Sequence, residues 1–150
     1  MDGQYSTRHR QELGASLGRG FTLIEVMVVV VIVTILAGIA YPSYRNQVIK
    51  GNRAAAQGYM MSLASREEQI MLDLRRYKAA ANRAALEAAG SGFIAPTSEV
   101  YKFYDVKIDV TDGTPPTYVI TATPKAGGMQ ASDGLLTLNS LGKKLPAGKW

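Results

Sequence analysis

The sequence predicts an α+β protein in which one long N-terminal helix packs on a small antiparallel sheet. Three patterns support this: a run of 19 uncharged residues at 26–44, helical periodicity from there to residue 77, and β-branched segments between turn signals after residue 100. The chain has 150 residues, 47% of them apolar and 19% charged, which leaves room for one small domain with an appendage.

The apolar run is long enough to cross a membrane. As a helix it would reach about 28 Å, close to the roughly 30 Å hydrocarbon core of a bilayer. A secretory signal peptide has a shorter apolar region with a small-residue cleavage site after it, whereas here Gly20 precedes the run. A buried core helix is a weaker alternative because such helices are shorter. We therefore expect residues 21–44 to form a transmembrane helix.

Glu25 is an acid near the start of this apolar helix. An acidic group costs on the order of 3 kcal/mol at mid-bilayer and less near the edge. Glu25 either marks the headgroup boundary or pairs with a cation. If the chain is cut before Phe21, the new α-amino group lies about one helical turn from Glu25. Subunits offset along the helix axis could then pair Glu25 of one chain with the amine of the next.

Residues 18–25, GRGFTLIE, resemble the processing motif of type IV prepilins and type II secretion pseudopilins. The resemblance implies that residues 1–20 are a leader, which prepilin peptidase removes by cutting after Gly20 before methylating the amine of Phe21. It also implies that Glu25 serves methylation and subunit docking, that Pro42 kinks the helix, and that residues 21–44 mediate polymerisation. The expected location is a single pass through the bacterial inner membrane, followed by assembly with other pilin subunits into a cell-surface pilus.

Residues 45–77 show the periodicity of an amphipathic helix, which would form the second half of the long helix. We expect its apolar stripe to pack on the sheet, with the charged residues mostly away from that stripe. The stripe consists of Val48, Ala55, Tyr59, Leu63, Ile70, Leu74 and Tyr77, and the charged residues are Arg53, Arg66, Glu67, Glu68, Asp73 and Arg76.

The rest of the chain contains a connection and a sheet. Residues 78–99 are expected to form a helix-to-sheet loop with a short helix at 84–89. Residues 100–150 are expected to form a C-terminal antiparallel β-sheet domain. Strand signals at 100–110, 117–123 and 135–140 have hairpin-like spacing, which indicates a meander.

The C-terminal segment, residues 133–150, resembles the minor-pilin branch of the same family. Those relatives commonly carry one cysteine before the glycine and another before the terminal tryptophan, where this chain has Asp133 and Lys149. We expect the two opposite charges to lie within about 8 Å of each other as an exposed pair, worth about 0–1 kcal/mol against about 2–4 for a disulfide.

The sequence offers little for catalysis. It contains no cysteine, and its one histidine, His9, lies in the expected leader, so common catalytic triads and zinc sites are excluded from the mature chain. Residues 109–113 are similar to part of a calcium loop but lack the other acidic ligands. We therefore expect no enzymatic activity, no metal and no cofactor.

These patterns predict a structural subunit of a type IV pilus, in particular a minor pilin acting in pilus assembly, adhesion, twitching motility or DNA uptake. The alternatives are a type II secretion pseudopilin and the DNA-binding receptor of a competence pilus. The receptor hypothesis rests on the formal net charge of +5 and on lysines near aromatic residues, which could contact phosphates and stack on bases. Scattered solvated lysines remain the simpler interpretation. The candidate DNA contacts are Lys143, Lys144 and Trp150, within a wider set of Tyr101, Lys102, Phe103, Lys107, Tyr118, Lys125 and Lys149.

Overall fold

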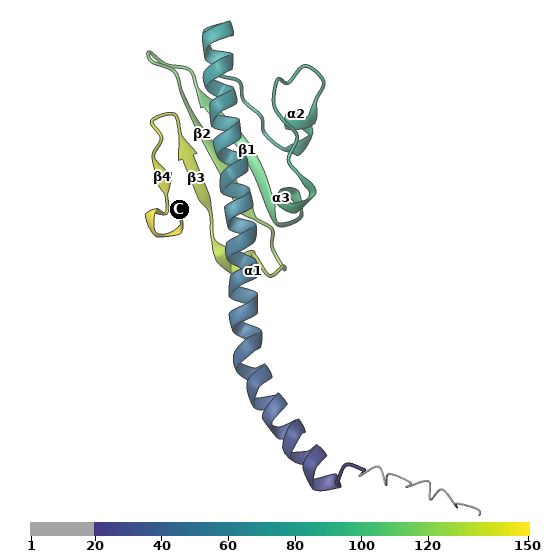
Figure 1. Cartoon of the computed structure of the whole chain (residues 1–150). Helices are drawn as coiled ribbons and strands as arrows, with labels where there is room; N and C mark the ends of the chain where they lie inside the picture. Colours follow the sequence, from purple (N-terminus) through teal and green to yellow (C-terminus); the bar gives the residue numbers. More distant parts are fainter. Residues whose placement is uncertain (1–19) are drawn as a thin grey trace, which may run out of the picture. The chain divides into compact units, whose positions relative to one another are not determined.

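A computed structural model describes residues 20–150, so the expected leader lies outside the described residues except for Gly20. The described chain divides into two compact units after Ile39, and α1 contributes residues to both. The elements are α1 (Leu23–Leu74), α2 (Arg83–Glu87), α3 (Ser98–Phe103), β1 (Tyr104–Thr111), β2 (Thr117–Pro124), the 3₁₀ turn η1 (Ala131–Asp133), β3 (Leu136–Asn139), β4 (Lys144–Leu145) and the 3₁₀ turn η2 (Ala147–Lys149) (Figure 1).

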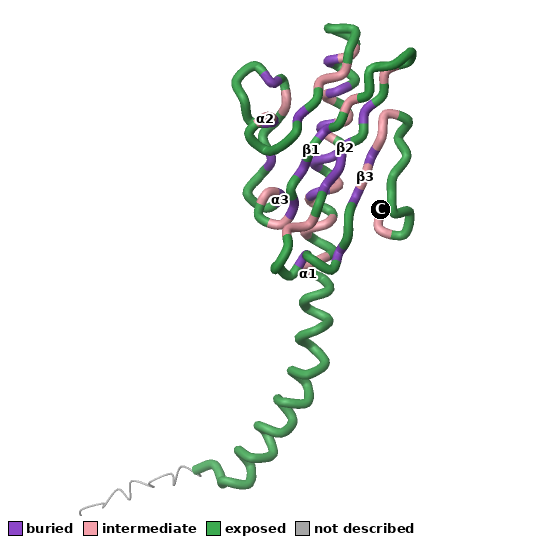
Figure 2. The backbone as a smooth tube through the Cα atoms, turned by 180° about the vertical axis from the view of Figure 1, so that it is seen from behind, coloured by how far each residue is buried: buried purple, intermediate pink, exposed green. Residues whose placement is uncertain are grey.

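The first unit contains the apolar start of α1. Residues 23–39 are exposed along their whole length (Figure 2). The most apolar 18-residue window of α1 has a mean hydropathy of 2.9, and none of that window is buried. By length and composition, α1 can therefore cross a membrane. The helix continues through Pro42, and the kink expected there stays a prediction.

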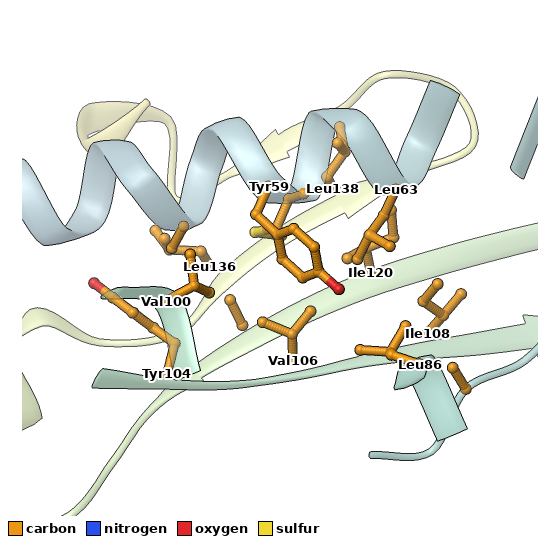
Figure 3. Packing of buried hydrophobic residues seen from close by; sticks show 14 of the residues in the cluster. Tyr59, Leu63, Leu86, Val100, Tyr104, Val106, Ile108, Ile120, Leu136 and Leu138 are labelled. Atoms are coloured by element: carbon orange, nitrogen blue, oxygen red, sulfur yellow. The ribbon is translucent and has the colours of Figure 1, made fainter. Parts of the chain in front are cut away.

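The second unit, residues 40–150, is a four-stranded antiparallel meander packed on α1. The strand order is β1-β2-β3-β4, with Ile120 of β2 opposite Ile108 of β1 and Leu138 of β3. Tyr59 and Leu63 of α1 face this sheet (Figure 3). The predicted fold class, a long N-terminal helix on a small antiparallel sheet, is confirmed. The core is formed by Ala56, Tyr59, Met60, Leu63, Ala80, Leu86, Val100, Tyr104, Val106, Ile108, Tyr118, Ile120, Ala122, Leu136 and Leu138.

The first strand starts later than predicted. Residues 98–103 form α3, which follows Thr97 at its N-cap position and carries Glu99 in its first turn. Strict alternation of buried and exposed residues begins only at Tyr104. The prediction that the strand starts at residue 100 was wrong. Val100 and Phe103, three residues apart, share one face of a helix, whereas a strand would place them on opposite faces.

Helix α1 ends at Leu74, three residues before its predicted end. Arg75 adopts φ 56°, a left-handed conformation that stops a helix. The predicted stripe is confirmed at Tyr59, Leu63 and Ile70, but Leu74 is exposed. Glu67 is completely buried, contrary to the expectation that the charged residues mostly avoid the stripe. It lies four residues after Leu63 and three before Ile70, and this spacing places it on the buried face.

Candidate nucleic-acid interface and assembly site

The three candidate DNA contacts lie close together at the C-terminal end of the chain. The Nζ atom of Lys144 lies 5.0 Å from the ring centroid of Trp150, in the range of a cation–π contact. The indole Nε1 of Trp150 donates a hydrogen bond to the carbonyl oxygen of Leu145 at 3.0 Å. Both Lys143 and Lys144 are exposed, and Trp150 is half-buried. This arrangement presents two ammonium groups and part of an aromatic ring to solvent.

The turn that carries Lys143 is closed by hydrogen bonds. Asn139 Oδ1 accepts from the backbone N–H of Leu141 at 3.1 Å and from that of Lys143 at 2.8 Å. Gly142 has φ 73°, a conformation that glycine adopts without strain. Asn139 was not among the predicted site residues, although asparagine followed by glycine three residues later is a turn signal.

Some of the other candidate lysines lie beside carboxylates, but Lys102 forms no ion pair among the described residues. Lys107 Nζ lies 2.8 Å from Asp109 Oδ2, and Lys125 Nζ lies 3.4 Å from Asp105 Oδ1. Within the part of the chain that the structure describes, Lys143 and Lys144 form no ion pair. Residues 134–150 contain three lysines and no acid. Lys143 and Lys144 are therefore uncompensated by acidic side chains, whereas Lys149 lies near Asp133.

A buried carboxylate anchors this segment. The side chain of Asp133 is 1% exposed, and Arg53 Nε donates to its two oxygens at 2.9 and 3.0 Å. Gln130 Nε2 donates at 3.0 Å, and the Tyr104 hydroxyl and Arg53 Nη2 also donate to the carboxylate. The Nζ atom of Lys149 lies 3.8 Å from Asp133 Oδ1. We call Arg53, Tyr104, Gln130, Asp133 and Lys149 the Asp133 cluster.

The expected proximity of Asp133 and Lys149 is confirmed, but the expectation of an exposed pair was wrong because Asp133 is buried. Arg53 is the closer partner of Asp133, although it was predicted among the charged residues that lie mostly away from the apolar stripe. Arg53 lies one turn before Gln57, whose Nε2 donates to the backbone oxygen of Lys149 at 2.6 Å. Two side chains of α1 thus hold the end of the chain.

Electrostatics keep this cluster charged at neutral pH. Burial by itself raises the pKa of the Asp133 carboxyl, but hydrogen bonds from Arg53, Tyr104 and Gln130 outweigh it and hold the pKa below its ordinary value. The hydrogen bond to Asp133 raises the pKa of the Arg53 guanidinium. The ionised pair is therefore the stable form.

The predicted processing residues lie at the start of α1. Gly20, Phe21 and Glu25 are all exposed. The backbone N–H of Glu25 donates to Thr22 Oγ1 at 3.3 Å and to the Thr22 carbonyl oxygen at 3.1 Å. Threonine followed by glutamate three residues later has the spacing of a capping box. Thr22, which was not predicted, caps the backbone N–H of Glu25, and this contact does not use the Glu25 carboxylate.

Glu67 is a buried acid outside both sites. Its Oε2 accepts a hydrogen bond from the backbone N–H of Lys78 at 3.0 Å, whereas Oε1 is without a hydrogen-bond partner among the described residues. Burial raises the pKa of Glu67 to about 7, although the hydrogen bond from Lys78 lowers it. Ionising Glu67 in the folded protein is therefore unfavourable.

Glu67→Gln is expected to stabilise the fold at alkaline pH. The unfolded carboxyl has its ordinary pKa of 4.5, so between pH 4.5 and about 7 the folded state binds more protons and stability falls as pH rises. We expect the variant to gain about 1–3 kcal/mol at pH 8 and little at pH 4. Near-UV circular dichroism during denaturation of the full chain in detergent measures this. Glu68→Gln, at an exposed position, is the control, and a wild type more stable than Glu67→Gln at pH 8 would contradict the prediction.

These features define a type IV pilin. The long helix begins with an apolar segment just after a glycine–phenylalanine junction, and a β-meander packs on the same helix. A model described as "Prokaryotic N-terminal methylation motif" matches residues 18–41, and one described as "Type IV minor pilin ComP, DNA uptake sequence receptor" matches residues 42–137. The chain belongs to this ComP family of type IV minor pilins, which is structural and not enzymatic. The methylation motif implies processing by prepilin peptidase.

Similarity to individual proteins covers a shorter stretch. The chain is 41% identical over 59 residues to type II secretion system core protein G of Pectobacterium carotovorum subsp. carotovorum, a match spanning 39% of this chain and 38% of that protein. It is 40% identical over 58 residues to type IV major fimbrial protein FimA of Dichelobacter nodosus, spanning 39% of this chain and 37% of FimA. The chain thus matches less than two thirds of each relative's length. No solved structure matches it. The family match favours the minor-pilin prediction over the pseudopilin alternative.

Proposed function

We propose that this chain is a minor subunit of a type IV pilus and binds double-stranded DNA through its C-terminal segment during DNA uptake. The observation that carries the proposal is the exposed pair Lys143 and Lys144, with no acid in residues 134–150 and with Trp150 beside Lys144. The description of the family as a DNA uptake sequence receptor supports it. The family match ends at residue 137. The assignment of Lys143, Lys144 and Trp150 to DNA binding therefore depends on their geometry and charge.

Each part of the segment has a role in this proposal. Lys143 and Lys144 contact phosphates, since ammonium groups supply sequence-independent attraction to the DNA backbone. Trp150 offers an aromatic edge and fixes Lys144 through the cation–π contact. The Asp133 cluster holds the end of the chain against α1, so the two lysines are presented on a fixed surface.

The N-terminal unit serves assembly. In this proposal prepilin peptidase cuts between Gly20 and Phe21 and methylates the Phe21 amine while the chain is anchored in the inner membrane. Glu25 of one subunit then receives the cationic amine of its neighbour within the pilus. A charge pair in an apolar environment is strongly destabilised when one member is lost, which makes this contact selective for correctly processed subunits.

Lys143→Gln combined with Lys144→Gln is expected to weaken DNA binding by about tenfold or more at 0.1 M salt. If both lysines neutralise phosphates, the slope of log affinity against log salt should fall by about 1.8. Fluorescence anisotropy of a labelled duplex, titrated with the full chain in an uncharged detergent, measures both quantities.

The matched control is Lys107→Gln combined with Lys125→Gln. It removes the same charge from lysines that are paired with Asp109 and Asp105. We expect this control to lose much less affinity. Equal losses in the two double variants would show that scattered surface charge binds DNA and that the C-terminal segment has no special part.

A further inference from the structure

Leu141 is an apolar residue that does not belong to the hydrophobic core. At 86% exposure it is the most exposed of the large apolar side chains in residues 40–150. It lies in the turn between β3 and β4, two residues before Lys143. A single exposed leucine is common on protein surfaces, so exposure alone indicates nothing. Its setting, however, is unusual in two respects, rigidity and charge.

The turn that presents Leu141 is fixed by several hydrogen bonds. Besides the two bonds accepted by Asn139 Oδ1, the backbone N–H of Gly142 donates to the Asn139 carbonyl at 2.9 Å, and that of Asn139 donates to the Lys143 carbonyl at 3.2 Å. The backbone N–H of Ser140 donates to the carbonyl of Tyr118 at 3.0 Å, which joins the turn to β2. The side chain of Leu141 is thus held outward at little further entropic cost on binding.

The positive charges beside Leu141 are complementary to the phosphates of a nucleic acid. Lys143 and Lys144 follow it after Gly142, and the nearest acid before it in the sequence, Asp133, is buried and paired with Arg53. Lysine contacts to phosphates position a protein on DNA but carry no sequence information. A receptor for a particular DNA sequence needs a further contact with bases or with DNA shape, and an exposed leucine beside these lysines can supply an apolar one.

We propose that Leu141 inserts as an apolar wedge between adjacent base pairs while Lys143 and Lys144 hold the flanking phosphates. This inference rests on the proposed function and adds the source of its sequence preference. An inserted apolar side chain partly unstacks one base step, and the energetic cost depends on which step is opened. Pyrimidine–purine steps such as TA open most readily, so a wedge favours DNA that carries one.

The test uses two duplexes of equal length, one with a central TA step and one without a pyrimidine–purine step at its centre. 2-Aminopurine replaces the central adenine, because its fluorescence rises when it unstacks. For the full wild-type chain in uncharged detergent we expect about tenfold tighter binding to the TA duplex, together with a rise in fluorescence. Leu141→Ala should bind both duplexes equally, with no rise, and should keep the wild-type salt dependence. Leu141→Met should retain most of the preference.

The matched control is Leu72→Ala, which removes a leucine of 78% exposure from α1. It should behave as wild type. Wild-type binding without TA preference and without a fluorescence rise would overturn the wedge while leaving the proposed function intact. An unchanged preference in Leu141→Ala would also overturn it. Absence of wild-type binding to either duplex in low salt would overturn both the wedge and the proposed function.

Discussion

Asp133→Ala is expected to destabilise residues 40–150 by about 3 kcal/mol and to release the C-terminal segment. The substitution leaves the Arg53 guanidinium, whose side chain is 19% exposed, without its carboxylate partner. Removing one member of a buried ion pair costs about 3–5 kcal/mol, and the partial exposure of Arg53 places the expected loss at the lower end. The Tyr104 hydroxyl loses an acceptor as well. Chemical denaturation of the full chain in detergent, followed by near-UV circular dichroism, measures the loss.

Asp105→Ala is the matched control, since it removes an exposed carboxylate paired with Lys125 at 3.4 Å and should cost less than about 1 kcal/mol. The pKa of Asp133 gives a second check. Because it lies below the ordinary 3.8 in the folded state, the stabilisation is present above that pH and is lost as pH falls through the folded pKa. A variant as stable as wild type at pH 7 would show that the Asp133 cluster does not hold the segment.

Glu25→Gln is expected to reduce incorporation of this chain into pili on the order of tenfold or more. Glutamine keeps the capping-box spacing with Thr22 but cannot pair with a cationic amine. Loss of 1.4 kcal/mol of docking free energy corresponds to a factor of ten, and an unpaired amine in an apolar contact costs at least that much. Immunoblots of sheared pili from cells that express only the variant measure incorporation.

Thr22→Ala separates the effect of the helix cap from that of the Glu25 charge. It removes the hydroxyl that accepts from the Glu25 backbone N–H and leaves the charge in place. We expect near-normal incorporation of Thr22→Ala. If Glu25→Gln enters pili as well as wild type does, the Glu25 carboxylate has no part in subunit docking.

The repeating patterns of the chain were predictable. Alternation in β1 correctly placed Tyr104, Val106 and Ile108 on one buried face, because a strand has a fixed period of two. The meander followed from short connections between strand signals. Such patterns depend only on residues that are close in the sequence, so they can be predicted from one sequence.

Contacts between charged residues distant in sequence were not predictable. Arg53 and Asp133 are 80 residues apart, and helical periodicity does not indicate that an arginine beside the apolar stripe reaches a buried carboxylate. Glu67 was predicted to lie away from the apolar stripe because it is charged, although its spacing from Leu63 and Ile70 places it on the buried face of α1. For the candidate DNA site, composition identified Lys143, Lys144 and Trp150. Only the structure showed that Lys107 and Lys125 are paired with carboxylates and that Asn139 fixes the turn.

The most direct test of DNA binding by this minor pilin is the affinity of the purified full chain for double-stranded DNA at two salt concentrations. Measured in uncharged detergent at 50 and 200 mM salt, the affinity should fall by about tenfold, as expected when two phosphates are neutralised. A chain that binds no DNA at 50 mM salt, or whose binding is unaffected by salt, would contradict the proposal that this minor pilin holds DNA through its C-terminal lysines.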